Sequence, residues 1–136
     1  MKGFFANIEQ DTLENQNFRK VEYTGKQMQL VTMSLLPKEE IGTEIHHEND
    51  QFFRFEAGEG KVLVDGTEYL VSDGSAVIIP AGAEHNVINT SSTEPLKMYT
   101  LYAPSHHKNG VIHATKAIAE QAELDGTDEF DGQTTE

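Results

Sequence analysis

The stretch GSAVIIPAGAEHNVIN, residues 74 to 89, joins two runs of strand-forming residues through a tight turn. The run SAVII has the apolar, β-branched character of a buried strand, and Pro80 ends it because proline has no N–H to donate to a sheet. Gly74 and the PAG turn permit two sharp reversals, which place His85 at the start of a returning strand. Strand alternation can then turn the His85 imidazole into the interior of a β structure.

Short β segments of the same kind extend outward from this stretch. Between Arg19 and Tyr102, turn residues interrupt the sequence about every eight to twelve positions, a spacing typical of a β sandwich or barrel. Asp65-Gly66 supplies the positive φ values of a type I′ turn, so Lys61 to Val64 and Thr67 to Val71 are predicted to form a hairpin. The fold class that follows is all-β.

A helix is predicted only in HATKAIAEQAEL, residues 113 to 124, which is rich in alanine and has apolar residues at helical spacing. We expect this helix to pack outside the barrel. The tail beyond Lys116 gathers acidic residues with no base among them, which predicts a solvated, frayed end. The expected organisation is a β-barrel over residues 1 to 112, with core motifs in 42 to 89, and a C-terminal helix and acidic tail over 113 to 136.

The composition narrows the class of protein. The 136 residues suit one domain, and the absence of cysteine means that any metal would be held by His, Asp, Glu or Gln. The formal net charge of -13 argues against nucleic acid or an anionic membrane as a partner, because both repel an acidic surface. No apolar run approaches the ~20 residues of a membrane helix, and the apolar start is too short for a signal peptide, so we expect a cytoplasmic protein.

Residues Gly74, Pro80, Gly82, His85 and Asn89 have the spacing G-x5-P-x-G-x2-H-x3-N. This spacing resembles the second motif of the cupin family, and the likeness looks closest to small single-domain cupins of the mannose-6-phosphate isomerase-like type. The resemblance implies a double-stranded β-helix, the cupin or jelly-roll barrel, with a metal in its interior. An inward histidine on its own is more often a satisfied core residue, so the interpretation depends on neighbouring ligands.

The first cupin motif has the form G-x5-H-x-H-x3 or 4-E-x6-G, and its two histidines and glutamate bind a metal together with the histidine of the second motif. Counting back from Gly58 places Gln51 at the glutamate position and His46 at the second histidine position. Glu44 then stands where the family usually has the first histidine, and the leading glycine matches only loosely. The resemblance thus implies a metal site made of Glu44, His46, Gln51 and His85.

Strand geometry distinguishes the two adjacent histidines. Glu44 and His46 are two positions apart, so in an extended strand both side chains leave the same face, while Ile45 and His47 leave the other face. His46 is therefore the predicted ligand. The alternative register would place Ile45 and His47 inside, which gives a poorer ligand set, and a β-bulge could produce it.

The ligand types suggest which metals could bind. Two imidazoles and one carboxylate with open positions suit ferrous iron, and the same mixture of N and O ligands accepts Mn²⁺, Ni²⁺, Co²⁺ or Zn²⁺. A neutral Gln51 carbonyl is a weaker ligand, so Gln51 could instead orient a water or a substrate hydroxyl, while Glu44 could move a proton. Without metal, Glu44 and Gln51 could simply hydrogen-bond the histidines in a polar pocket.

The segments that follow carry weaker signals. Alternation from Gln51 places Phe53 and Phe55 inward, either as core residues or as one wall of a substrate cavity. The segment KMYTLYAPSHH is expected to form the last strand, and its tyrosines Tyr99 and Tyr102 are either half-buried or at the barrel mouth.

His106 and His107 lack metal-ligand spacing to the main site. Surface or chain-anchoring roles and a place over the barrel mouth both remain open for them.

The fold alone does not specify a reaction. The resemblance favours a metal-dependent enzyme acting on a small oxygen-rich metabolite, such as a sugar, uronate or keto acid, by isomerisation, cyclisation or related lyase chemistry. A non-haem iron dioxygenase and a non-catalytic binding or sensing protein are the alternatives. Many such cupins are dimers that share edge strands, so the expected partners are a small molecule and a second copy of the chain.

Overall fold

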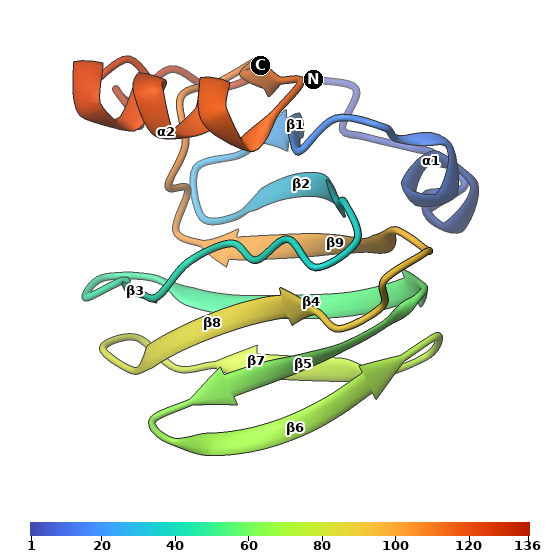
Figure 1. The fold of residues 1–136 in the computed structure, drawn as a ribbon. Coiled ribbons are helices and arrows are strands. Elements are labelled where there is room, and N and C mark those ends of the chain that lie inside the picture. The colour runs from blue at the N-terminus through green and yellow to red at the C-terminus, as the bar shows by residue number, and fades with distance from the viewer.

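The computed structural model describes all 136 residues as two antiparallel β-sheets packed face to face, with a helix near each end of the chain (Figure 1). The expected all-β fold with a short C-terminal helix is confirmed. The strands are β1 (Arg19–Thr24), β2 (Gln29–Leu35), β3 (Glu44–Ile45), β4 (Asp50–Ala57), β5 (Glu59–Val64), β6 (Thr67–Ser72), β7 (Ala76–Ile79), β8 (Glu84–Asn89), β9 (Leu96–Ala103) and β10 (Ile112–His113). The helices are α1 (Ile8–Glu14) and α2 (Lys116–Asp125).

The larger sheet has the strand order β10-β1-β2-β9-β4-β7, and the smaller sheet has the order β3-β8-β5-β6. Because β4 and β5 follow each other in the chain but lie in different sheets, the chain crosses between the layers as a jelly roll does. The predicted hairpin is confirmed as β5 and β6. Its turn residues Asp65 and Gly66 have φ values of 45° and 82°, as a type I′ turn requires.

The core fills the space between the sheets with inward-facing side chains of alternate residues. Phe53 and Phe55 on β4 are 1% and 0% exposed, so the core interpretation of these two residues is confirmed. Gln51 lies two positions earlier on the same face and is 3% exposed. The inward face of β4 is therefore apolar at Phe53 and Phe55, and it carries the polar, similarly buried Gln51 toward one end of the barrel.

Two expectations for individual strands are wrong. The SAVII run is an edge strand of the larger sheet, and Ile78 is 68% exposed while Val77 and Ile79 are buried. Strand β7 therefore shows the alternation of a half-buried strand. Strand β9 is also not the last one, because β10 follows and pairs with β1.

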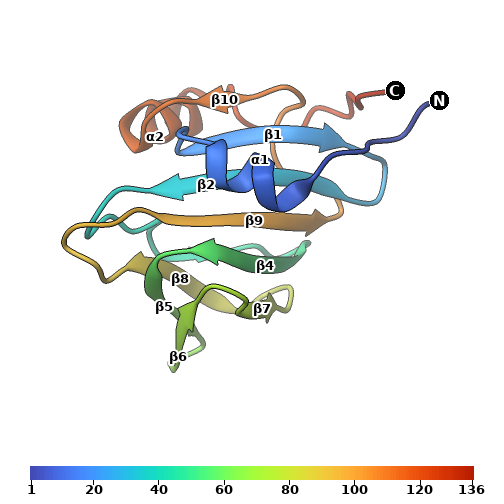
Figure 2. The same ribbon diagram turned by 90° about the vertical axis from the view of Figure 1, so that its right-hand side faces the viewer.

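Helix α1 is a feature that the sequence analysis missed. Its Asn7 side chain caps it by accepting a hydrogen bond from the Gln10 N–H at 3.0 Å. The helix lies across the outer face of the larger sheet, against β2, β9 and β4 (Figure 2). With seven residues it is too short to show a clear apolar period, so its burial against the sheet decides its formation.

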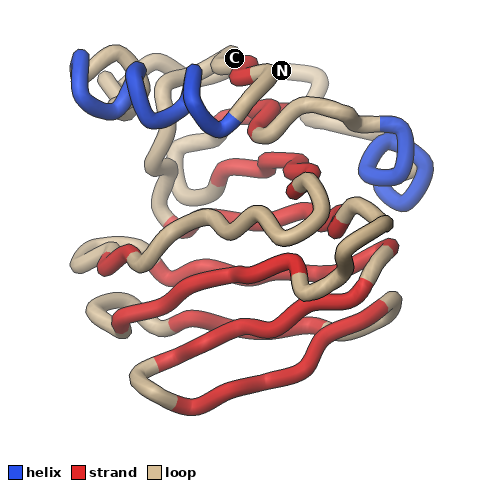
Figure 3. Tube along the Cα trace, in the orientation of Figure 1, coloured by secondary structure: helices blue, strands red, loops and turns tan.

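The C-terminal helix starts at Lys116 rather than residue 113, with Thr115 as its N-cap. It packs against β10, the edge strand of the larger sheet, and lies outside the barrel (Figure 3). Beyond α2, the expectation of a frayed tail is wrong. Asp128 is 8% exposed, Glu129 pairs with His107 in a β-bridge, and the Phe130 N–H donates to His106 O at 3.1 Å. These contacts hold the tail over one end of the barrel. Neither helix is long and apolar enough to span a membrane.

Glycine at position 58, between β4 and β5, provides a test of the close approach of this turn to the start of β9. A Cβ at Gly58 would lie 2.3 Å from Pro95 O, whereas a Cβ at Gly74 would meet nothing within 4 Å, although φ is 91° and 90° at the two positions. Alanine suffers a similar backbone strain at both sites, but only Gly58→Ala adds a clash with main-chain atoms. Gly58→Ala should lower the free energy of unfolding by at least ~2 kcal/mol more than Gly74→Ala, measured by urea denaturation. Equal losses would contradict this packing.

Candidate metal centre

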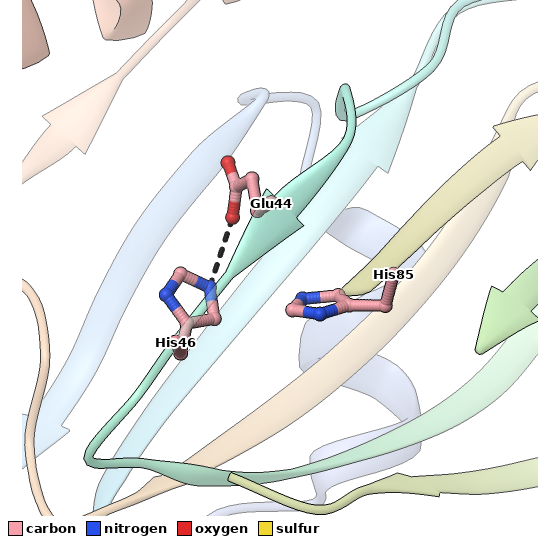
Figure 4. A group of neighbouring side chains, drawn as sticks. All are labelled: Glu44, His46 and His85. Atoms are coloured by element: carbon pink, nitrogen blue, oxygen red, sulfur yellow. Dashed lines mark ion pairs between the residues drawn. The ribbon is translucent and has the colours of Figure 1, made fainter. Parts of the chain in front are cut away.

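The candidate metal centre forms where β3 pairs with β8. The antiparallel register sets Glu44 opposite His85, and His46 follows one residue after β3 ends. Figure 4 shows the three side chains converging from the two strands. One potential ligand atom from each residue lies within 4.8 Å of the other two. The structure thus brings together three of the four predicted ligands, while metal binding itself stays a prediction.

The two adjacent histidines point in opposite directions, as strand alternation predicts. His46 Nε2 lies 2.9 Å from Glu44 Oε2, and its side chain is 9% exposed. Ile45 and His47 are both exposed to solvent. The register with Ile45 and His47 inside is therefore wrong, because no bulge in β3 interrupts the alternation.

His85 is oriented by its own backbone segment. Its Nδ1 lies 3.0 Å from Ala83 O, and because a carbonyl can only accept, Nδ1 carries the proton. Burial lowers the pKa of His85 and favours the neutral ring. The lone pair of Nε2 is then free for a metal, which is the arrangement seen when a second hydrogen bond sets the tautomer of a metal-binding histidine.

Gln51 lies in the same interior but has a different set of contacts. Its Nε2 donates to Thr100 Oγ1 at 3.0 Å, whereas its Oε1 is buried without a hydrogen-bond partner. His46 Nε2 also lacks an aligned hydrogen bond, even though Glu44 Oε2 lies close to it. Because buried polar atoms are normally paired, the unpaired Gln51 Oε1 fits a bound cation or its water, and a cation bound here would take the place of the proton between Glu44 Oε2 and His46 Nε2. The donor set therefore suits a divalent transition metal.

The charge state of Glu44 also suits a cation. Burial raises the pKa of Glu44, but the contact with His46 and the positive charge of Arg19 outweigh burial, so the pKa lies below its ordinary value. The carboxylate is consequently ionised at neutral pH and available as a ligand.

A cluster of aromatic and imidazole rings that sequence reasoning did not assign to the site lies beside these residues. His106 is stacked edge-on against His46, with 4.3 Å between ring centroids. The ring centroid of Tyr102 lies 5.8 Å from that of His46. Tyr102 is 2% exposed, so it is a buried residue rather than a half-buried one. Burial, together with the neighbouring His107 and His46, lowers the pKa of His106 to about 3. The neutral rings wall one side of the site.

His107 connects this cluster to the C-terminal tail. Its Nδ1 donates to Asp128 Oδ2 at 2.9 Å, which leaves Nε2 to accept from the Tyr102 hydroxyl at 3.1 Å. Asp128 Oδ2 also lies 3.6 Å from Arg19 Nη1. Of the roles left open for His107, chain anchoring is correct, and its location is the barrel mouth.

A cavity of about 560 Å³ opens at this mouth, large enough for a small metabolite. Glu44 and His46 line this cavity, and so do Asp128, Glu129 and Phe130 of the tail. Among the residues of this part of the cavity, the sequence drew attention only to the His106-His107 doublet, shortly after β9. The sequence did not predict that Arg19 and Asp128 line the cavity, because neither residue belongs to a recognisable motif.

The geometry defines a class of protein: a small jelly-roll barrel with a histidine and carboxylate group in its interior and a polar cavity above it. A model of the family described as "Cupin domain" matches residues 31–102. The chain belongs to the cupin family, as the spacing from Gly74 to Asn89 predicted.

Similar proteins extend the likeness beyond that domain. The chain is 47% identical over 128 residues to the uncharacterized protein YrkC of Bacillus subtilis, covering 90% of this chain and 68% of that protein. It is 42% identical over 112 residues to the uncharacterized protein L612 of Acanthamoeba polyphaga mimivirus, covering 80% of this chain and 70% of that protein. The crystal structure of BH2720 from Bacillus halodurans superposes on this chain with a TM-score of 0.87 at 43% identity, covering 89% of this chain and 96% of the other.

The buried His107 leads to a prediction about stability in acid. Burial lowers the pKa of His107 to about 4, while the unfolded residue titrates near 6.5. Between these values the unfolded chain binds more protons, so the free energy of unfolding should fall as the pH drops from about 6.5 to about 4. His107→Gln should remove up to ~3 kcal/mol of this pH dependence. Urea denaturation of metal-free protein at several pH values measures it.

His47→Gln is the matched control for that experiment, because the exposed His47 side chain changes its surroundings little on unfolding. The control should keep the pH dependence of the wild type. An unchanged slope in His107→Gln would contradict the assignment to His107.

Proposed function

We propose that this cupin is a metal-dependent enzyme that acts on a small oxygen-rich metabolite by isomerisation, cyclisation or related lyase chemistry. The observation that carries the proposal is the group of Glu44, His46 and His85, of which Glu44 and His46 line a polar cavity, together with the unpaired acceptor atom Oε1 of the buried Gln51. A cytoplasmic location remains part of the proposal.

The ligands would come from Glu44, His46 and His85, with Gln51 either as a fourth ligand or directed at a bound water or substrate hydroxyl. When bound, a divalent metal would polarise a substrate oxygen as a Lewis acid. Gln51 is held in place by its hydrogen bond to Thr100, so its free Oε1 has a defined direction. The rings of His106 and Tyr102 stack on each other beside His46 and would restrict the orientation of a bound substrate on that side.

Glu44 has a second possible role beside metal binding. Its carboxylate lines the cavity and is partly accessible, with 26% of the side chain exposed. A weakly bound carboxylate in this position is within reach of a substrate proton, which is the role of a general base in isomerisation. Glu44 and Gln51 are therefore the proposed catalytic residues.

Oxygen activation is a second candidate function, favoured by one specific observation. Two imidazoles and one carboxylate form the ligand set of many non-haem iron oxygenases. Oxygen consumption by the iron-reconstituted protein with keto acid substrates would support the dioxygenase. Turnover of sugars, uronates or keto acids without oxygen uptake would support isomerase or lyase chemistry. Tight ligand binding without any turnover would instead favour a binding or sensing protein.

The metal content of single variants tests the site directly. We expect about one Zn²⁺, Fe²⁺ or Mn²⁺ per chain in the wild type, and a loss of affinity of at least ~10-fold in His46→Ala and His85→Ala, because each removes an imidazole ligand. Elemental analysis and titration of metal-free protein measure both quantities.

His47→Ala provides a control that differs from His46→Ala by one position along the strand. It should retain the metal stoichiometry and affinity of the wild type, because its ring faces solvent. The metal site would be refuted by a wild type without stoichiometric metal, or by His85→Ala with undiminished affinity.

A homodimer through the edge strands is also part of the proposal. Strands β6 and β7 end the two sheets at the same end of the barrel, and Leu70 and Ile78 on them are 81% and 68% exposed. Exposed apolar edges favour association. Ile78→Glu should shift the sedimentation of the protein from dimer to monomer, whereas Tyr23→Phe, far from these strands, should not. A monomeric wild type would contradict the dimer.

A further inference from the structure

Arg19 is a buried charged residue that the proposed function does not use. Its side chain is 7% exposed, it lines the cavity at the barrel mouth, and its Nε has no hydrogen-bond partner. A guanidinium carries five N–H donors, and leaving them unpaired in the interior is unfavourable. Arg19 thus lines the cavity with a guanidinium whose donors no hydrogen bond occupies, although Nε itself is buried.

The contact with Asp128 does not satisfy this guanidinium. Arg19 Nη1 lies 3.6 Å from Asp128 Oδ2, which is longer than a hydrogen bond and far from the bidentate geometry of a strong arginine–carboxylate pair. The same Oδ2 atom already accepts from His107 Nδ1 at 2.9 Å. Asp128 thus neutralises part of the charge but leaves the donors of Arg19 free.

Arg19 shares the cavity with the metal-ligand group. The residue stands on the inward face of β1, with Val21 on the same face in the core. Glu44 and His46 line the same cavity, so one small molecule could contact both regions.

We propose that Arg19 binds the carboxylate of a small carboxylic acid whose other end lies at Glu44, His46 and His85. The planar fork of a guanidinium matches the two oxygens of a carboxylate, and the pairing is strongest in a site partly shielded from water. Contact with the ligand's second end rests on the proposed function, whereas the contact with Arg19 does not. A carboxylate narrows the substrate class to uronates, keto acids and similar acids.

The charges around the cavity favour a carboxylate over a phosphate. Arg19 is the only lysine or arginine in the cavity wall, and the acids Glu48, Glu123 and Glu129 are exposed at its rim. The charge of Arg19 is already shared with Asp128 and Glu44, so a phosphate dianion would add a larger uncompensated charge to the cavity than the single charge of a carboxylate. Solvent screens the rim acids, so they disfavour a second negative charge without excluding the first.

The chain contains only two arginines, which makes a direct test possible. In ¹⁵N-labelled protein the side-chain Nε–H groups of Arg19 and Arg54 give two NMR signals, assigned with Arg54→Lys. Arg54 is the matched control because its side chain is 40% exposed and pairs with Glu56. Malonate is the probe, with phosphate and glycerol as comparisons, in both metal-free and Zn²⁺-loaded protein.

We expect malonate to move the Arg19 signal saturably, phosphate to move it only at roughly tenfold higher concentration or more, and glycerol and the Arg54 signal to show no change. Arg19→Lys should weaken malonate binding roughly tenfold while leaving Zn²⁺ stoichiometry unchanged, because lysine loses the bidentate fork. The Arg19 site would be overturned if malonate leaves the wild-type Arg19 signal unmoved, or if phosphate binds there as tightly.

The two proposals fail in different ways. Stoichiometric Zn²⁺ binding without a malonate response at Arg19 would overturn the carboxylate site and leave the proposed function standing. A malonate response at Arg19 in protein that binds none of Zn²⁺, Fe²⁺ and Mn²⁺ would support the carboxylate site and overturn the proposed function.

Discussion

The antiparallel pairing of β3 with β8 is the constraint on which the candidate site depends. It sets Glu44 opposite His85, and because side chains alternate along a strand, the same register turns His46 inward and His47 outward. A slip of one residue would exchange these faces and leave an isoleucine beside His85. The strand is only two residues long, so its position depends on neighbouring contacts, including the Gly82 N–H that donates to His46 O at 2.9 Å.

The C-terminal tail contributes a further part of the cavity wall. Asp128 orients His107, and His107 accepts a hydrogen bond from Tyr102 in the centre of the larger sheet. This chain of contacts extends from the tail to the interior beside His46. The barrel alone would leave its mouth open, whereas the tail encloses a polar cavity and determines which charges a ligand meets.

Several features followed from local sequence because local physics determines them. The Asp65-Gly66 turn requires positive φ values, which few other residue pairs adopt without strain, so the hairpin was predictable. The choice of His46 over His47 followed from the two-residue period of a strand. Helix α1 was missed because it is short and owes its formation to packing on the sheet. The frayed tail was a wrong prediction, because acidic composition cannot reveal that Asp128 has a histidine and an arginine as partners.

The sequence by itself determined the β-barrel class, the cupin motif from Gly74 to Asn89 and the inward face that carries Glu44 and His46. These features depend on turn residues and alternation, which act over a few neighbouring positions. Only the tertiary structure decided that Arg19, near the start of the chain, meets Asp128, near its end, and that both lie at one cavity with His107. Such contacts arise when sheets and tail pack together, and no local period records them.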